Sequence, residues 1–316
     1  MLAEKLLRRE GGLCFYGITP PKLATPPESL AEIARVQRER VAALGPDGLV
    51  VYDIQDESDR NAQPRPFPFF PLLDSADYAE RLLGELSVER IVYRCVHRLP
   101  RADFVTWLNQ TRARPRRSLS VLVGAPSRNT DPNALRLSEA NLLAKELAPE
   151  LLLGGIAIAE RHATRGDEHE RLIAKMEQGC RFFISQTVYD ASSTKSLLSD
   201  YALLLASKQL PPVPILFTFA PCGSVKTLEF MKWLGITFPR WLENELRHSA
   251  DPLEQSIRLC EQQFEEVLDF AARKNVPVGI NVESVSIRKA EIEASAELFR
   301  RLKARLRRHC AGSGVR

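Results

Sequence analysis

Long apolar segments, paired cysteines and a strong charge imbalance are all missing from this sequence. No stretch approaches the roughly 20 apolar residues that a bilayer-crossing helix needs, so no membrane association is expected. The 44 basic and 40 acidic residues leave a net charge of +4, too small an excess to predict nucleic-acid binding. The six cysteines form no C-x-x-C motif, and several lie in apolar runs, as is typical of free thiols in a reducing cytoplasm.

What the sequence does contain is a regular alternation of short apolar runs and helical segments. Segments with helical periodicity, such as 27–44, 137–147, 168–179 and 252–274, separate the apolar runs. Continuous apolar strands alternating with helices are typical of a parallel sheet covered on both faces. The eight runs predict strands near residues 13–18, 49–54, 90–96, 119–125, 151–159, 180–186, 214–220 and 276–282.

Eight parallel strands can close on themselves, so the predicted fold is α/β, a (β/α)8 barrel in which residues 1–316 form one domain. An open doubly wound sheet is the alternative. It normally carries a G-x-G-x-x-G loop after an early strand, and the sequence has none. Two long insertions, 60–78 and 235–252, are expected to form lids or packing arms.

Barrel enzymes place their chemistry at the carboxyl ends of the strands, where the βα loops meet. Polar side chains are frequent at these predicted ends. A mouth of this composition suits a polar, ring-shaped small molecule. The side chains concerned are Asp53, Gln55, Asp56, Glu57, Arg94, His97, Glu160, His162, Gln186, Asp190 and Glu283.

Several of these loops carry motifs of a known family. The segment PPK follows the first strand, E-x-H follows the fifth, GCRFFISQTVYD spans the sixth, and FPRWLENEL follows the seventh. From about residue 13 to residue 305 the chain resembles the methylenetetrahydrofolate reductases. The sixth-strand motif is the most specific part. The resemblance implies a barrel that acts on a reduced folate in one-carbon metabolism.

The resemblance also implies roles for individual residues. Gln186 matches the glutamine that hydrogen-bonds the pterin, and Asp190 closes the same motif. Glu160 and His162 match the E-x-H, and Lys175 matches a lysine near the flavin phosphates. Simpler interpretations stay open, because Gln186 could cap a loop and His162 could be a hydrogen-bonded structural residue.

The chain departs from the family pattern where flavin and catalytic acid are expected. Gly17 stands at the position of the acidic residue, and Val123 and Ala125 replace the charged residues after the fourth strand. Val92 replaces a histidine, and YDIQDES replaces a glycine-rich loop. Larger side chains in that loop would overlap an isoalloxazine ring, so tight FAD binding is not expected.

The acidic loop 53–59 after the second strand offers a replacement for the missing acid. Asp53 and Asp56 lie three positions apart and can raise each other's pKa if they share the barrel mouth. Glu283, which is predicted beside the first strand, is a further catalytic candidate. Gln55 and Arg94 are predicted binding residues, and Arg94 could instead neutralise the acids. A solvated turn is the simpler interpretation.

These observations predict an oxidoreductase that transfers a hydride from NAD(P)H directly to a methylene-tetrahydrofolate-type substrate. Lys175, Arg165 and the basic run 112–117 are weak candidates for nucleotide phosphates. A folate-dependent one-carbon transferase or demethylase and a non-catalytic folate-binding protein are the alternatives. No metal is expected, because Glu160 and His162 lack a third ligand in sequence. Homo-oligomer formation is left open.

Overall fold

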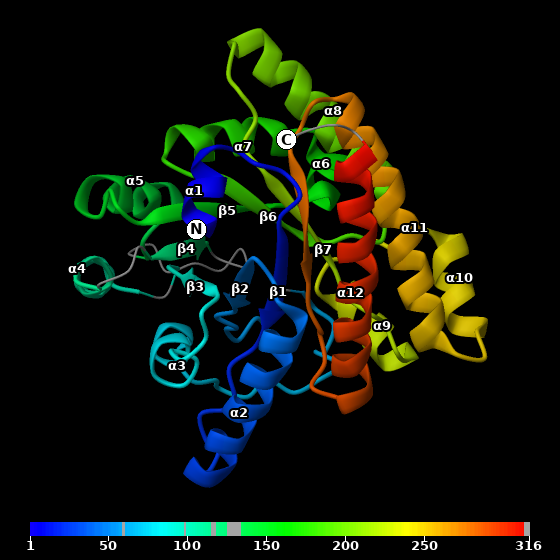
Figure 1. The fold of residues 1–316 in the computed structure, drawn as a ribbon, viewed down its shortest axis with the longest axis horizontal. Helices are drawn as coiled ribbons and strands as arrows, with labels where there is room; N and C mark the ends of the chain where they lie inside the picture. Colours follow the sequence, from blue (N-terminus) through cyan, green and yellow to red (C-terminus); the bar gives the residue numbers. More distant parts are fainter. Residues whose placement is uncertain (59–60, 98, 115–117, 125–133, 313–316) are drawn as a thin grey trace. The chain divides into compact units, whose positions relative to one another are not determined.

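The computed structural model describes residues 1–58, 61–97, 99–114, 118–124 and 134–312 (Figure 1). Eight strands form a closed barrel in chain order, and the pairings described are parallel. The predicted (β/α)8 barrel is therefore confirmed. The strands are β1 (Cys14–Ile18), β2 (Gly48–Val51), β3 (Glu89–Cys95), β4 (Leu119–Val123), β5 (Leu152–Ala157), β6 (Phe182–Thr187), β7 (Ile215–Phe219) and β8 (Val278–Val282).

Helices follow the strands in alternation. The segments predicted at 27–44 and 137–147 form helices with those bounds, and those predicted from 168 and 252 end slightly earlier than expected. The helices are α1 (Leu2–Leu7), α2 (Pro27–Leu44), α3 (Ser75–Arg81), α4 (Arg101–Arg112), α5 (Leu137–Leu147), α6 (Ala159–Arg165), α7 (Glu168–Glu177), α8 (Ala191–Lys208), α9 (Val225–Trp233), α10 (Arg240–His248), α11 (Pro252–Arg273) and α12 (Lys289–Gly312).

Among the strands that end earlier than predicted, β2 and β5 are each followed by a carboxylate that binds a backbone amide. After β2, Asp53 accepts a hydrogen bond from the amide of Cys95 at 2.8 Å. After β5, Glu168 accepts one from the amide of Ile158 at 3.2 Å. A side-chain partner thus replaces the strand ladder. The fourth strand was expected to reach Ala125, which lies outside the described residues.

The chain divides into two compact units. The first comprises Met1–Leu7, Gly17–Ile156 and Ala174–Phe182, and the second comprises Arg8–Tyr16, Ala157–Ile173 and Phe183–Arg316. Each unit has its own apolar core of the kind that stabilises a fold by burial. Buried residues include Val50, Ile91 and Val121 in the first unit and Phe183, Phe217 and Ile280 in the second.

Both insertions pack against neighbouring elements of their own unit. In the first unit, the amide of Leu23 donates to Pro71 and the amide of Leu73 to Pro21, which fixes the segment before α3 to the loop after β1. In the second unit, α10 buries Leu242 and Leu246 and contacts α11. Figure 1 shows α11 and α12 running side by side. No helix among the described residues is long and apolar enough to cross a membrane.

Candidate functional site

Gln186 precedes the last residue of β6, Thr187, and binds the segment that follows α9. Its Nε2 donates to the carbonyl oxygen of Leu234 at 3.0 Å. Leu234 caps α9, and the next residue, Gly235, has a positive φ of 87°, which favours glycine. Gln186 therefore fixes the start of segment 234–237 at the carboxyl end of β6.

Glu160 lies in the first turn of α6 and contacts the other end of the same segment, because its carboxylate accepts a hydrogen bond from the amide of Thr237. Burial raises the pKa of Glu160 to about 7. The amides of Glu160 and Thr237 oppose this rise, and the charges of Asp190 and Glu168 add to it. The segment 234–237 thus joins two of the predicted binding residues.

Two further predicted residues lie in the second unit. Asp190 is the N-cap of α8, where Oδ1 accepts from the amides of Ser192 and Ser193 at 3.0 and 3.3 Å. Glu283 follows β8, and its Oε1 accepts from the hydroxyl of Thr187 at 3.4 Å. The ends of β5, β6 and β8 therefore bring together Glu160, Gln186, Asp190 and Glu283.

His162 faces another neighbour. It lies on α6 with its side chain buried, and its Nε2 is 3.0 Å from Oδ2 of Asp200 on α8. The ring also meets the ring of His169 edge-on, with centroids 5.2 Å apart. His162 thus belongs to the contact between α6 and α8, and its predicted role in substrate binding stays a prediction.

The acidic residues after β2 make local hydrogen bonds in the first unit. Asp53 Oδ1 accepts from the side-chain Nε2 of Gln55 at 2.5 Å, and its Oδ2 accepts from the backbone amide of Cys95 at 2.8 Å. Asp56 accepts from the amide of Ser58 at 3.0 Å, as in an Asx turn. These bonds give Asp53 and Asp56 structural roles, and their catalytic roles stay predictions. Asp59 lies outside the described residues.

Arg94 and Lys175 also have partners in the first unit. Arg94 Nη1 donates to Asp74 Oδ2 at 2.8 Å, and its guanidinium lies over the ring of Trp107. Burial raises the pKa of Asp74, but Arg94 and two backbone amides outweigh this effect and lower it. Lys175 Nζ donates to the carbonyl oxygen of Ile156 at 2.5 Å. The binding roles expected for both residues stay predictions. Residues 115–117 of the basic run lie outside the described residues.

Sequence reasoning missed the contribution of segment 234–237. It also missed Thr187, although this residue lies inside the most specific motif. The FPRW segment that begins at Phe238 was the available signal, since it directly follows Thr237. Backbone atoms of Leu234 and Thr237 make the contacts, and backbone contacts leave no residue-type signature in a sequence.

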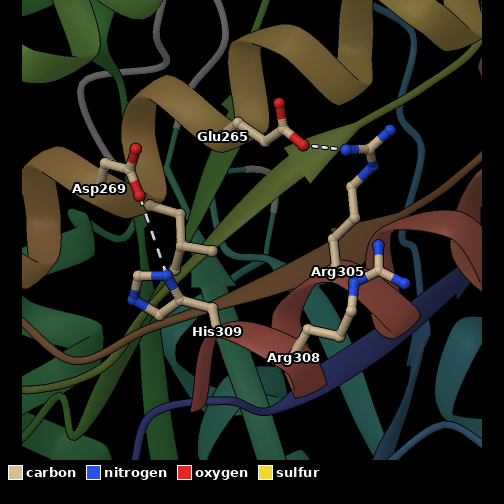
Figure 2. A pocket seen from close by; sticks show the side chains of 6 residues that line it. Glu265, Asp269, Arg305, Arg308 and His309 are labelled. Atoms are coloured by element: carbon tan, nitrogen blue, oxygen red, sulfur yellow. Dashed lines mark hydrogen bonds and ion pairs between the residues drawn. The ribbon is translucent and has the colours of Figure 1, made fainter. Parts of the chain in front are cut away.

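A surface pocket lies elsewhere in the second unit, between α11 and α12 (Figure 2). Figure 2 shows Arg305 directed at Glu265 and His309 directed at Asp269, the latter pair at 3.8 Å. About 24 Å of helix separates Arg305 from Lys289, where α12 begins after β8. The pocket is therefore remote from the carboxyl end of β8, and its paired charges join the two helices.

No protein-family model and no curated protein matches the chain. Among solved structures, an uncharacterized protein from Clostridium thermocellum that binds two copies of 5-methyl-5,6,7,8-tetrahydrofolic acid is 42% identical, with a TM-score of 0.84. The match covers 96% of this chain and 99% of that chain. This chain belongs to the family of the Clostridium thermocellum protein.

Other barrels resemble this family in fold alone. A thermostable chitinase domain from Pyrococcus furiosus is 11% identical with a TM-score of 0.51, and the match covers 93% of this chain and 97% of that one. An intracellular xylanase from Thermoanaerobacterium saccharolyticum is 15% identical with a TM-score of 0.50, covering 87% and 89%. These matches show a shared fold and no shared activity, because one barrel fold hosts many functions.

Proposed function

We propose that this protein binds a reduced folate of the 5-methyltetrahydrofolate type. The observation that carries the proposal is the relative that is 42% identical over nearly the whole of both chains and binds 5-methyltetrahydrofolic acid. The cluster formed by Glu160, Gln186, Asp190 and Glu283, which we call the folate cluster, supports it. A pterin presents an amide and an exocyclic amine, which pair with the carboxamide and carboxylate groups that Gln186 and Glu160 supply.

The proposed reaction is the reduction of methylene-tetrahydrofolate. The bond between the methylene carbon and N10 breaks as N10 takes a proton, and the methylene carbon takes a hydride from NAD(P)H to become the 5-methyl group. Glu283, Asp53 and Asp56 are the candidate acids. Glu283 is the candidate within the folate cluster. The relative's ligand is the product of this reaction, which supports the proposal.

NAD(P)H enters this proposal as a diffusing reductant without an assigned site. Lys175, the predicted phosphate ligand, donates to a backbone carbonyl. Methyl transfer from 5-methyltetrahydrofolate is the second candidate, favoured by the methylated form of the relative's ligand.

Calorimetric titration with 5-methyltetrahydrofolate tests the binding proposal. The wild-type protein should bind, and Gln186→Ala should lose about 1 to 3 kcal/mol, because a buried polar partner is left unpaired. Gln262→Ala, at an exposed position on α11, is the matched control and should bind as the wild type does. Absence of binding by the wild type would overturn the proposed function. Equal affinity of the Gln186 and Gln262 variants would remove Gln186 from the site.

A second assay distinguishes the reactions. With methylene-tetrahydrofolate and NAD(P)H, a reductase consumes the nicotinamide and forms one 5-methyltetrahydrofolate for each hydride. A transferase, given 5-methyltetrahydrofolate and a nucleophilic methyl acceptor such as a thiol, moves the methyl group to that acceptor, releases tetrahydrofolate and leaves the nicotinamide absorbance unchanged. Folate binding with neither reaction would reject the enzymatic part of the proposal and retain the binding part.

A further inference from the structure

Three side chains of the second unit, each from a different helix, converge at the contact between α6 and α8. They are His162 of α6, His169 of α7 and Asp200 of α8. Each offers one nitrogen or oxygen atom, and these atoms all lie within 4.8 Å of one another. Two imidazoles and a carboxylate are a recurrent protein ligand set for Zn²⁺.

The two histidines have polar atoms that the protein leaves unsatisfied. The His162 side chain is 4% exposed, and its Nε2 is 3.0 Å from Asp200 Oδ2. Nδ1 of His162 and Nδ1 of His169 are both buried without a hydrogen-bond partner. A buried ring nitrogen without a partner destabilises the fold. A cation bound by Nδ1 of His169 would remove that cost for His169, and in His162 the nitrogen that lies beside Asp200 is Nε2.

Access and geometry also suit a cation. The Asp200 side chain is 48% exposed, so the cluster opens to solvent on one side. Tetrahedral Zn²⁺ with bonds of about 2.0 to 2.1 Å requires ligand atoms about 3.3 Å apart. The pair formed by His162 and Asp200 is close to this spacing at 3.0 Å. Small side-chain rotations suffice for atoms that lie up to 4.8 Å apart.

The charged groups nearby are already paired with one another. Glu168, which is fully buried, accepts from Arg161 at 2.7 Å, and Asp167 accepts from Arg171 at 3.1 Å. Arg161 and Arg171 thus have carboxylate partners of their own. Asp200 is the carboxylate that lies beside the two histidines.

We propose that His162, His169 and Asp200 bind a divalent zinc ion, with solvent as the fourth ligand. The site joins the α6–α7 pair to α8 and is separate from the folate cluster. Zn²⁺ binding would hold α6, the helix that carries Glu160, against α8. This inference does not depend on the proposed function, because the three ligands and the folate cluster share no residue.

Zinc titration of the chelator-treated full chain tests the proposal. Calorimetry should show one Zn²⁺ per chain, and Zn²⁺ should raise the melting temperature. His169→Gln and Asp200→Asn should each weaken binding at least about tenfold, since loss of even an outer-shell partner costs 10- to 100-fold. His248→Gln, which removes an exposed histidine of α10, should bind Zn²⁺ as the wild type does.

Cobalt absorption provides a second readout that does not depend on stability. Co²⁺ in a site of two nitrogens and an oxygen should give visible bands without thiolate charge transfer, and His169→Gln should lose them while keeping a cooperative melt. No Zn²⁺ binding by the wild type, thiolate bands, or equal binding by His169→Gln and His248→Gln would each overturn the proposal.

Discussion

At the scale of single residues, carboxylates take over backbone hydrogen bonds where strands and helices meet loops. Asp53 binds the amide of Cys95, Glu168 binds the amide of Ile158, and Asp190 caps α8. Asp53, Asp56 and Glu57 follow the apolar strand β2. Part of that charge pairs with backbone N–H groups at loop junctions, so a structural role accounts for Asp53 even without a ligand.

Glu160 allows a test at this scale, because its pKa is raised from 4.5 to about 7. A raised carboxyl pKa contributes stability that is complete below pH about 4.5 and is lost as the pH rises through about 7. The full loss is about 3.5 kcal/mol, at about 1.4 kcal/mol per pKa unit. Glu160→Gln removes the titration. The free energy of unfolding of the variant minus that of the wild type should be more positive at pH 8 than at pH 5.

Urea unfolding at the two pH values, with a chelator present, measures this difference. Glu243→Gln is the matched control. Hydrogen bonds from Lys232 and Arg247 lower the pKa of Glu243, so its contribution should be the same at pH 5 and pH 8. A Glu160→Gln stability change that is equal at both pH values would show that the carboxyl does not titrate in this range.

At the scale of elements, the sequence predicted the number and order of the strands better than the residues at which they end. Continuous apolar runs identified the strands because a strand buried on both faces must be apolar throughout. The predicted second strand ran to residue 54, but β2 ends at Val51, and the fifth ended at Ala157 instead of 159. Apolar periodicity cannot show these ends, since distant side chains determine them.

Packing between β5 and β6 depends on one glycine. A Cβ atom at Gly154 would overlap the ring of Phe182, which is fully buried. Gly154→Ala should therefore destabilise the protein by about 1 to 3 kcal/mol through overpacking. Phe182→Leu should relieve the overlap in the double variant. Urea unfolding of the four proteins should give a double-mutant total below the sum of the single effects, and strict additivity would contradict the overlap.

At the scale of the whole molecule, the closed barrel was predictable and its side-chain clusters were not. Eight strands with no dinucleotide loop predicted closure, and the strand order confirms it. The partners of the predicted residues come from elsewhere in the chain. Leu234 lies 48 positions after Gln186, and Asp200 lies 38 positions after His162. Without those partners, the sequence indicated Glu160 and His162 as neighbours, whereas they contact different elements.

Alkylation of the cysteines can measure opening of the fold, because the six residues are free thiols distributed along the chain. Cys14, Cys180, Cys222 and Cys260 are buried, and Cys95 and Cys310 are partly exposed. Burial raises the pKa of Cys180, Cys222 and Cys260 to about 12, which suppresses the reactive thiolate. Partial burial also raises the pKa of Cys310, so alkylation of native protein at pH 8 should be faster at Cys95 and Cys310 than at the other four, where it should require opening of the fold.

Folate binding should slow that opening-dependent reaction. A ligand that binds the folded state at 100 times its Kd stabilises it by about 2.7 kcal/mol, which lowers the open fraction about 100-fold. Saturating 5-methyltetrahydrofolate should therefore slow alkylation of the buried thiols by up to about 100-fold and leave Cys310 unchanged. Mass spectrometry of the labelled peptides follows each cysteine separately. Equal slowing of Cys310 would indicate quenching of the reagent by the folate, and unchanged rates at Cys180, Cys222 and Cys260 would argue against folate binding to the folded protein.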